Sequence, residues 1–325
     1  MEQKLKIYVP QKTAAILAQD AELFEFRKKD RSVNRNAFLN TLTVRYFDHY
    51  RRETEATHAS IAEVLQNFDL PQEQSSRIAD VLLVHLQKDN VWDEKNDIAL
   101  SLKPTRESGD LIAWIESSML GGNSLSGWFR NMFASYASMP RDIREKIIFS
   151  DTLEQINEAI RSGCRISFSL RRDPAVIYTA EPYAVDSSHG ELFNYLVCME
   201  NGRPMSFRLS RIRRVIRLSE TFRFLPETVQ ELERIVRTGP QYAFRRPCHV
   251  SVQLTDTGEK RFESMYLHRP VYTSVHDHIY EFSCSPVQIL QYFSRFGKDA
   301  VILEPASLAM EMKRFYEEGA SVYDW

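Results

Sequence analysis

Six arginines fall within the seventeen residues from 201 to 217, and no acidic residue accompanies them. A guanidinium group binds phosphate through paired hydrogen bonds and also stacks on bases. Surfaces usually mix charges of both signs, so this stretch indicates a polyanion site. The competing interpretations are a solvated rim and, for two of the arginines, structural salt bridges. The six are Arg203, Arg208, Arg211, Arg213, Arg214 and Arg217.

Alternating apolar and polar strings, separated by polar turns, surround these arginines and predict a small barrel-like β fold. A helix that begins with a capping box of Asp151 and Glu154 and ends at Gly163 is expected before them. In the last string, residues 207 and 209 are expected to face the core and Arg208 the solvent or a groove. The strings cover residues 165–170, 181–185, 193–197 and 206–212, with turns at 187–190 and 200–202.

Tyr195 lies in the third string and can offer a stacking platform, together with Tyr183 and the edge of Phe168. Each base stacked on such a platform contributes about 1 to 3 kcal/mol. A groove of this kind accepts single strands with little sequence preference. The alternative is that Tyr195 is a core residue. The candidate contacts are Arg165, Ser167, Arg171, Tyr195, Arg203, Arg208, Arg211, Arg213 and Arg214, and Arg172 widens the same basic surface.

A strand–helix–helix order occurs twice in the N-terminal part of the chain. A single short strand needs a partner, and the ribbon-helix-helix fold supplies one by antiparallel pairing of two copies. Here both copies lie in one chain, so we expect their strands to pair internally. The first copy comprises a strand at 5–9 and helices at 11–27 and 38–47, the latter capped by Ser32 or Asn34. The second comprises a strand at 98–102, a helix broken at Gly121 and Gly122, and a helix capped by Ser124 or Ser126. Connecting helices at 61–68 and 78–86 are separated by Pro71.

The outward residues of the two predicted strands differ in chemistry. In the first strand they are Lys4, Lys6 and Tyr8, which suit phosphate or base contacts. In the second, positions 97, 99 and 101 hold Asp, Ala and Ser, which do not. This asymmetry argues against ordinary operator recognition, and the N-terminal domain is expected to serve mainly as a scaffold.

Composition indicates a folded chain without a uniformly basic surface. The 325 residues are 43% hydrophobic and carry a formal net charge of -2. Any polyanion site must therefore be a local patch. By count, residues 1–52 carry +5 and residues 53–125 carry -8. The apolar runs are shorter than a membrane span, the first residues lack a signal core, and the four cysteines are isolated, so a cytoplasmic protein without membrane contact is expected.

Catalytic motifs find little support in the sequence. His276 and His278 flank Asp277 and share one strand face, but no carboxylate cluster is near them in the sequence, so they are predicted to be surface histidines. The chain contains neither a phosphate-cradling Gly-x-x-x-x-Gly-Lys loop nor a Gly-x-Ser-x-Gly elbow. We expect no enzymatic activity, no metal and no cofactor.

In their order and spacing, the strings of residues 149–220 resemble the WYL domain, an Sm/SH3-like β-barrel of bacterial regulators. Asn194 occupies the position of the tryptophan in the Trp-Tyr-Leu string that names the family, and Ser210 occupies a position where aspartate is usual. Tyr195, Arg208 and Arg211 match the family pattern. The resemblance implies a small Sm/SH3-like β fold for this segment.

Residues 221–325 resemble the α+β extension that often follows WYL domains and is associated with dimer formation. A linker helix ending near Gly239 and Pro240 is followed by strand, strand, helix, strand and helix. With a ribbon-helix-helix-like domain at 1–148, the α+β multidomain arrangement is similar to the WYL-domain accessory proteins of type VI-D CRISPR systems. That resemblance implies a homodimer that binds single-stranded RNA and stimulates an RNA-targeting effector nuclease.

Two other functions stay open. In the first, a transcriptional repressor binds duplex DNA through Lys4, Lys6 and Tyr8 and senses a nucleotide or nucleic-acid fragment in the WYL domain. In the second, a protein adaptor uses the arginines to meet an acidic partner. The -8 stretch at 53–125 could seek a basic partner, although a solvated helical face is the simpler interpretation.

Overall fold

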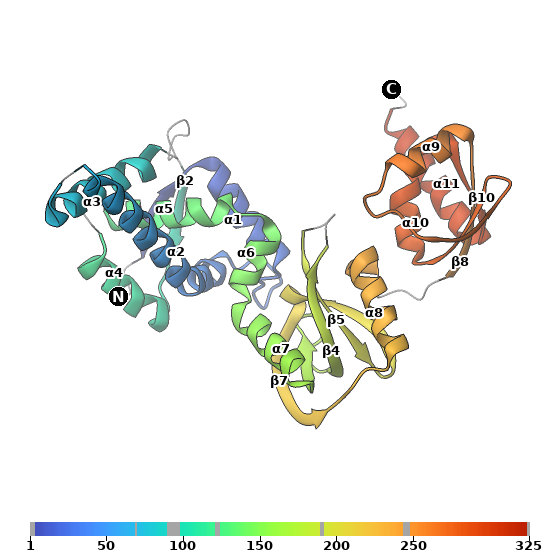
Figure 1. The fold of residues 1–325 in the computed structure, drawn as a ribbon, viewed down its shortest axis with the longest axis horizontal. Helices are drawn as coiled ribbons and strands as arrows, with labels where there is room; N and C mark the ends of the chain where they lie inside the picture. Colours follow the sequence, from blue (N-terminus) through green and yellow to red (C-terminus); the bar gives the residue numbers. More distant parts are fainter. Residues whose placement is uncertain are drawn as a thin grey trace. The chain divides into compact units, whose positions relative to one another are not determined.

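Two short strands that are far apart in the sequence pair with each other in the computed structural model (Figure 1). β1 (Leu5–Val9) and β2 (Ile98–Leu102) are antiparallel, and Ile7 lies opposite Leu100. Ile7 and Val9 are buried, whereas Lys6 and Tyr8 are exposed. The ribbon therefore has one apolar face against the core, and the predicted internal pairing of the two strands is confirmed.

The structure describes residues 4–68, 70–89, 98–120, 124–188, 192–242 and 248–323. The chain forms two units, residues 1–151 and residues 152–325. The predicted outward residue Asp97, the helix break at 121–122 and the turn residues 189–190 lie outside the described ranges. Among the described residues, no helix is long and apolar enough to cross a membrane.

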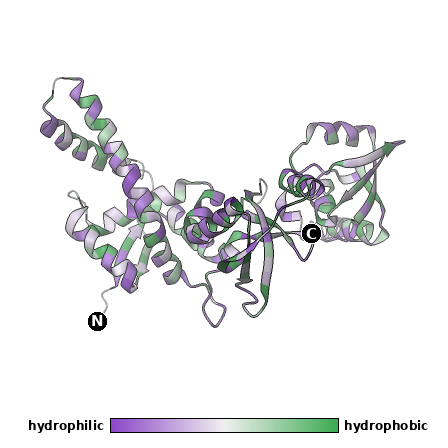
Figure 2. Ribbon diagram, turned by 60° about the horizontal axis from the view of Figure 1, so that its bottom comes forward, coloured by the Kyte–Doolittle hydropathy of each residue, from purple (hydrophilic) through white to green (hydrophobic). Residues whose placement is uncertain are grey.

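Capping residues start the main helices of the N-terminal unit where the sequence predicts them. The Asn34 side chain accepts a hydrogen bond of 3.1 Å from the Ala37 amide, and Ser124 accepts one of 3.1 Å from the Gly127 amide. Apolar and polar positions alternate around these helices (Figure 2). The helices are α1 (Gln11–Leu23), α2 (Arg35–Gln66), α3 (Gln72–Asp89), α4 (Arg106–Ser118), α5 (Leu125–Ser138) and α6 (Arg141–Ile148).

The helices differ from the prediction at several places. α3 begins at Gln72 rather than at residue 78, and α6 is not predicted. The helices expected at 38–47 and 61–68 are parts of the single helix α2, since residues 48–60 contain no proline or glycine and Arg51 pairs with Glu55 one turn away at 3.3 Å. α1 ends at Leu23 rather than near residue 27, because Glu25 adopts a left-handed φ of 59°.

A buried ion pair joins three helices in the N-terminal core. The Arg144 guanidinium of α6 donates to Asp20 of α1 through Nε at 2.6 Å and through Nη2 at 2.9 Å. The Tyr136 hydroxyl of α5 donates to the same carboxylate at 3.0 Å. The two parallel hydrogen bonds offset the free-energy cost of removing both charges from water. Together with the bond from Tyr136, they connect α1, α5 and α6.

The middle of the chain forms a five-stranded antiparallel sheet with strand order β6-β5-β4-β3-β7. The edge strands β6 and β7 are joined by η1 (Leu209–Arg211), a 3₁₀ turn. A flat sheet would hold these edges about 19 Å apart, whereas a turn of this type spans less than about 10 Å. The sheet must therefore curl until its edges meet near η1. Its strands are β3 (Cys164–Leu170), β4 (Ile177–Ser187), β5 (Asn194–Glu200), β6 (Arg203–Arg208) and β7 (Ile212–Thr221).

The helix before this sheet, α7 (Ser150–Ser162), begins two residues earlier than a cap at Asp151 would allow. Asp151 therefore lies in its first turn rather than at the cap, and its carboxylate pairs with Arg45 at 2.5 Å. The predicted capping box is wrong for this reason. The end at Gly163, which has a φ of 61°, agrees with the prediction.

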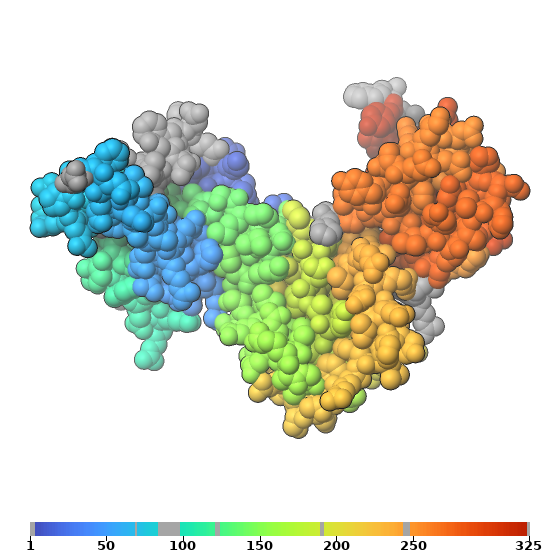
Figure 3. Space-filling view, in the orientation of Figure 1, coloured from blue at the N-terminus to red at the C-terminus, as the bar shows by residue number. Residues whose placement is uncertain are grey.

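Residues 248–323 form a separate sheet with its own core. Figure 3 draws this part of the chain in orange and red. The strand order is β11-β8-β10-β9 with antiparallel neighbours, the split βαβ arrangement of ferredoxin-like folds. Its elements are β8 (Cys248–Leu254), α9 (Asp256–Ser264), β9 (Tyr272–His276), β10 (Ile279–Cys284), α10 (Pro286–Phe293), β11 (Ala300–Glu304) and α11 (Ala306–Ser321). The prediction omitted α9 and β9, because α9 is short and charged and every residue of β9 is exposed. The multidomain α+β architecture agrees with the expectation.

The linker helix α8 (Pro226–Thr238) packs Leu232 and Ile235 against Val197 of β5. It ends at Gly239, whose φ of 121° suits glycine, and η2 (Pro240–Tyr242) follows. This turn returns the chain to β6, where Ser206 Oγ donates to the Pro240 carbonyl at 2.5 Å. η2 therefore lies beside β6, at the end of the curled sheet.

Candidate nucleic-acid interface

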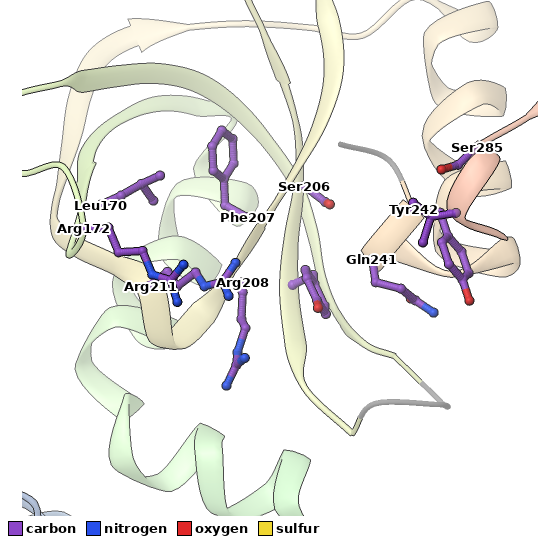
Figure 4. Close-up of a pocket in the computed structure, with 11 residues that line it drawn as sticks. Leu170, Arg172, Ser206, Phe207, Arg208, Arg211, Gln241, Tyr242 and Ser285 are labelled. Atoms are coloured by element: carbon purple, nitrogen blue, oxygen red, sulfur yellow. The ribbon is translucent and has the colours of Figure 1, made fainter. Parts of the chain in front are cut away.

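A pocket of about 320 Å³ opens at the end of the curled sheet, beside η1 (Figure 4). This volume is at the lower end of the range for small-ligand sites, which is about 300 to 1,000 Å³. Three arginines gather on one side, and Gln241, Tyr242 and Ser285 lie on the other. The lining residues are Leu170, Arg172, Tyr195, Ser206, Phe207, Arg208, Arg211, Gln241, Tyr242, Ser285 and Val287.

Arg208 is the last residue of β6 and is only 9% exposed. Its guanidinium carbon lies 3.2 Å from the centroid of the Phe193 ring. Stacking on an aromatic face stabilises a desolvated guanidinium and fixes its plane. The prediction placed Arg208 at the solvent or a groove; it lies in the pocket and is mostly buried. Leu209 belongs to η1 rather than to the predicted strand, although it and Phe207 are buried as expected.

Tyr195 lies next to Arg208 in the sheet, because the two residues are directly opposite in the β5–β6 register. Asp186 lies opposite Tyr195 on the other side, on β4. Tyr195 is half-buried and lines the pocket. Its ring can therefore present a face to a ligand, which the fully buried Phe168 of the same sheet cannot do.

η1 holds the other two arginines of the pocket in place. The Arg171 amide donates to the Arg211 carbonyl at 2.9 Å, and Arg171 Nε donates to the Ser210 carbonyl at 2.8 Å. The predicted contact residue Arg171 thus holds the turn through two hydrogen bonds. Arg172, which follows it, and Arg211 of the turn both line the pocket. Three guanidinium groups therefore line one small cavity.

Several predicted contact residues lie elsewhere. Arg165 pairs with Glu181 on the neighbouring strand at 2.6 Å. Ser167 lies on the face of β3 opposite to the pocket residue Leu170, since side chains alternate along a strand. Arg203 begins β6, about 17 Å along the strand from Arg208. Arg213 and Arg214 are exposed on β7, outside the pocket.

The residues on the second side of the pocket are not predicted from the sequence. Gln241 and Tyr242 come from η2, after α8, and their approach to β6 depends on tertiary packing. The turn signal of Gly239 and Pro240 predicts only that the helix ends there. Gln241 Oε1 is buried and has no hydrogen-bond partner among the described residues, so it is available to accept from a ligand.

The candidate residues of the N-terminal ribbon form a separate exposed surface. Lys4, Lys6 and Tyr8 are all exposed, and Tyr8 is 44% accessible. Arg130 of α5 donates through Nε to the Tyr8 carbonyl at 2.7 Å, which adds a guanidinium at the edge of the ribbon. The facing strand contributes Ala99 and Ser101. The positive charge of this surface therefore comes from one strand of the ribbon and from α5.

Residues 151–216 match the WYL domain family, so this chain contains a WYL domain. A solved structure described as "Crystal structure of a CRISPR Cas-related protein" has a similar fold, with a TM-score of 0.75 and 21% sequence identity over 100% of this chain and 95% of that chain. At this identity the likeness shows the fold alone. Proteasome accessory factor B/C (PafBC) of Arthrobacter aurescens has a TM-score of 0.33 and 15% identity over 82% of this chain and 46% of that chain, too low to support an argument. No curated protein matches the chain.

Proposed function

We propose that this chain is a single-stranded RNA-binding accessory protein that stimulates an RNA-targeting type VI-D CRISPR effector. The observation that carries the RNA part is the pocket in which Tyr195 stands beside Arg208 and near Arg172 and Arg211. An aromatic face for a base next to guanidinium groups for phosphates is the usual means of binding single strands. The proposal assigns no catalytic step to the chain itself.

The accessory role rests on two findings about the whole chain. A WYL domain is present, and the fold resembles that of a protein described as CRISPR Cas-related over 100% of this chain. The proposal includes a homodimer formed through the C-terminal module. Sedimentation that shows only monomer at micromolar concentration would contradict the dimer and leave the RNA site unaffected.

Fluorescence anisotropy with matched single-stranded RNA, single-stranded DNA and duplex DNA tests the RNA site. We expect tight binding of the RNA and its loss in the Arg208→Ala/Arg211→Ala double variant. The matched control is Arg203→Ala/Arg213→Ala, which removes the same charge from residues outside the pocket. Thermal unfolding confirms that both variants fold. Equal losses in the two double variants would argue against the pocket as the site.

Stimulation is tested with a purified type VI-D effector, its guide RNA and a reporter RNA. We expect faster reporter cleavage when the wild-type chain is added and no acceleration from the pocket variant. Acceleration by a variant that no longer binds RNA would separate the accessory role from the RNA site.

A WYL-family regulator that binds duplex DNA is the second candidate. The exposed Lys6 and Tyr8 on the paired ribbon favour it, since a two-stranded ribbon fits the major groove. Preferential binding of a defined duplex, abolished by Lys4→Ala/Lys6→Ala and unaffected by the pocket substitutions, would support this function instead.

A further inference from the structure

Two carboxylates and an imidazole converge in the C-terminal module. Asp256 and Glu259 lie one turn apart on α9, and His278 lies in the turn between β9 and β10. Metal-binding atoms of the three residues all lie within 4.8 Å of one another, and His278 Nδ1 is 3.2 Å from Glu259 Oε2. Within the described ranges of the chain, this is the one group of its kind.

We propose that Asp256, Glu259 and His278 bind a divalent transition-metal ion of the zinc type. A mixed set of one imidazole and two carboxylates suits Zn²⁺ and Co²⁺, whereas Mg²⁺ and Ca²⁺ select sites made of oxygen alone. The present spacing needs only small side-chain rotations to bring all three atoms within about 2.0 to 2.2 Å of one ion. Three protein ligands leave a fourth position for water.

Contacts outside the cluster already orient its members. The Tyr280 hydroxyl donates to Glu259 Oε1 at 3.0 Å, which leaves Oε2 directed toward His278. In metal sites, the carboxylates that bind the ion are usually oriented by a hydrogen bond of this kind. The Leu254 amide donates to the His278 carbonyl at 2.9 Å and fixes the turn that carries the imidazole.

The position of α9 is equally constrained. Thr255 caps the helix by accepting a hydrogen bond of 3.1 Å from the Gly258 amide, which places Asp256 in the first turn. A Cβ atom at Gly258 would lie 2.2 Å from the Asp299 carbonyl oxygen, so α9 packs directly on that backbone. Both carboxylates are therefore presented from a rigid element, as a binding site requires.

The sequence does not reveal this cluster, because its carboxylates are not close to the histidines along the chain. The string His276-Asp277-His278 has no suitable neighbours along its own hairpin, and the carboxylates come from a helix about twenty residues earlier. An ion at this point would link α9 to the β9–β10 turn, so its expected effect is to stabilise the C-terminal module.

Calorimetric titration of the chelator-treated, full-length protein with Zn²⁺ tests the proposal. We expect one equivalent to bind, with affinity reduced at least about tenfold in His278→Gln and in Asp256→Asn. The matched control is His276→Gln, which changes an exposed histidine outside the cluster. Thermal unfolding should show a Tm that rises with Zn²⁺ in wild type and His276→Gln and rises less at the same Zn²⁺ concentration in the other two variants. Asp256→Asn keeps the test valid if His278→Gln does not fold.

Titration with Co²⁺ distinguishes this site from zinc bound by the free cysteines. Nitrogen and oxygen ligands give only weak visible bands, whereas thiolates add intense near-ultraviolet absorption. Three results would each overturn the proposal. They are thiolate absorption that persists in His278→Gln, equal affinity for Zn²⁺ in all three variants, and no binding at submillimolar Zn²⁺. The readouts do not depend on RNA binding, so they leave the proposed function to its own test.

Discussion

Arg208 carries a positive charge at a buried position, and the ring of Phe193 covers one face of its guanidinium group. Lysine at this position would keep the charge but lose the planar contact with the ring. A desolvated cation–π contact contributes about 2 kcal/mol. Without this contact the cation is no longer held in a fixed position in the pocket, so we expect Arg208→Lys to weaken RNA binding roughly tenfold or more in an anisotropy titration. Arg213→Lys, at an exposed position on β7, should leave the affinity unchanged; equal weakening in both variants would contradict the assignment.

The stability of the N-terminal unit should be sensitive to the loss of either partner of the buried pair of Asp20 and Arg144. Removing one partner leaves a buried charge without compensation, which costs about 3 to 5 kcal/mol. We expect Asp20→Asn to lower the free energy of unfolding by that amount, as measured by urea denaturation. The exposed pair of Glu73 and Arg77, at 2.9 Å, is the control. Its removal should cost less than about 1 kcal/mol, and a comparable loss there would contradict the argument.

Burial also sets the reactivity of Cys284. Burial raises the pKa of its thiol to about 12. Only about one molecule in ten thousand therefore carries the thiolate at pH 8. Alkylation of the folded protein by iodoacetamide, followed by mass spectrometry, should be slow at Cys284 and should accelerate about tenfold per pH unit between pH 7 and 10, because the thiolate is the reacting form. A rate equal to that of the unfolded chain at pH 8 would show that the thiol is accessible and unperturbed.

At the scale of elements, η1 links the curvature of the WYL sheet to the pocket. Arg171 clamps this turn through the Ser210 carbonyl, and the turn positions Arg211. We expect Arg171→Met to lower the stability of residues 152–325 by about 1 to 3 kcal/mol, because a buried carbonyl loses a charged donor. RNA affinity should fall with it, since Arg211 is no longer held. Thermal unfolding and anisotropy measure the two effects; a loss of affinity without loss of stability would make Arg171 a direct contact.

The elements differ in how far the sequence predicts them. β1 and β2 follow from strict alternation and the stops at Pro10 and Pro104, and their pairing follows from the repeat. β9 has no buried residue, so no apolar periodicity marks it. The pocket was predicted on its arginine side only. Its second wall and the cluster at His278 arise where η2 and α9 meet distant strands, and such contacts have no local signature.

At the scale of the whole molecule, a net charge of -2 coexists with a pocket that holds three arginines. Counterion release depends on the local phosphate contacts rather than on the net charge. If each pocket arginine neutralises one phosphate, the logarithm of RNA affinity should fall with the logarithm of salt concentration with a slope of about -2, from about -0.7 per contact on a single strand. Arg172→Ala/Arg211→Ala should flatten the slope by about 1.4. The control Arg203→Ala/Arg213→Ala should keep the wild-type slope, and a slope that changes equally in both double variants would mean that RNA follows a diffuse basic surface instead of the pocket.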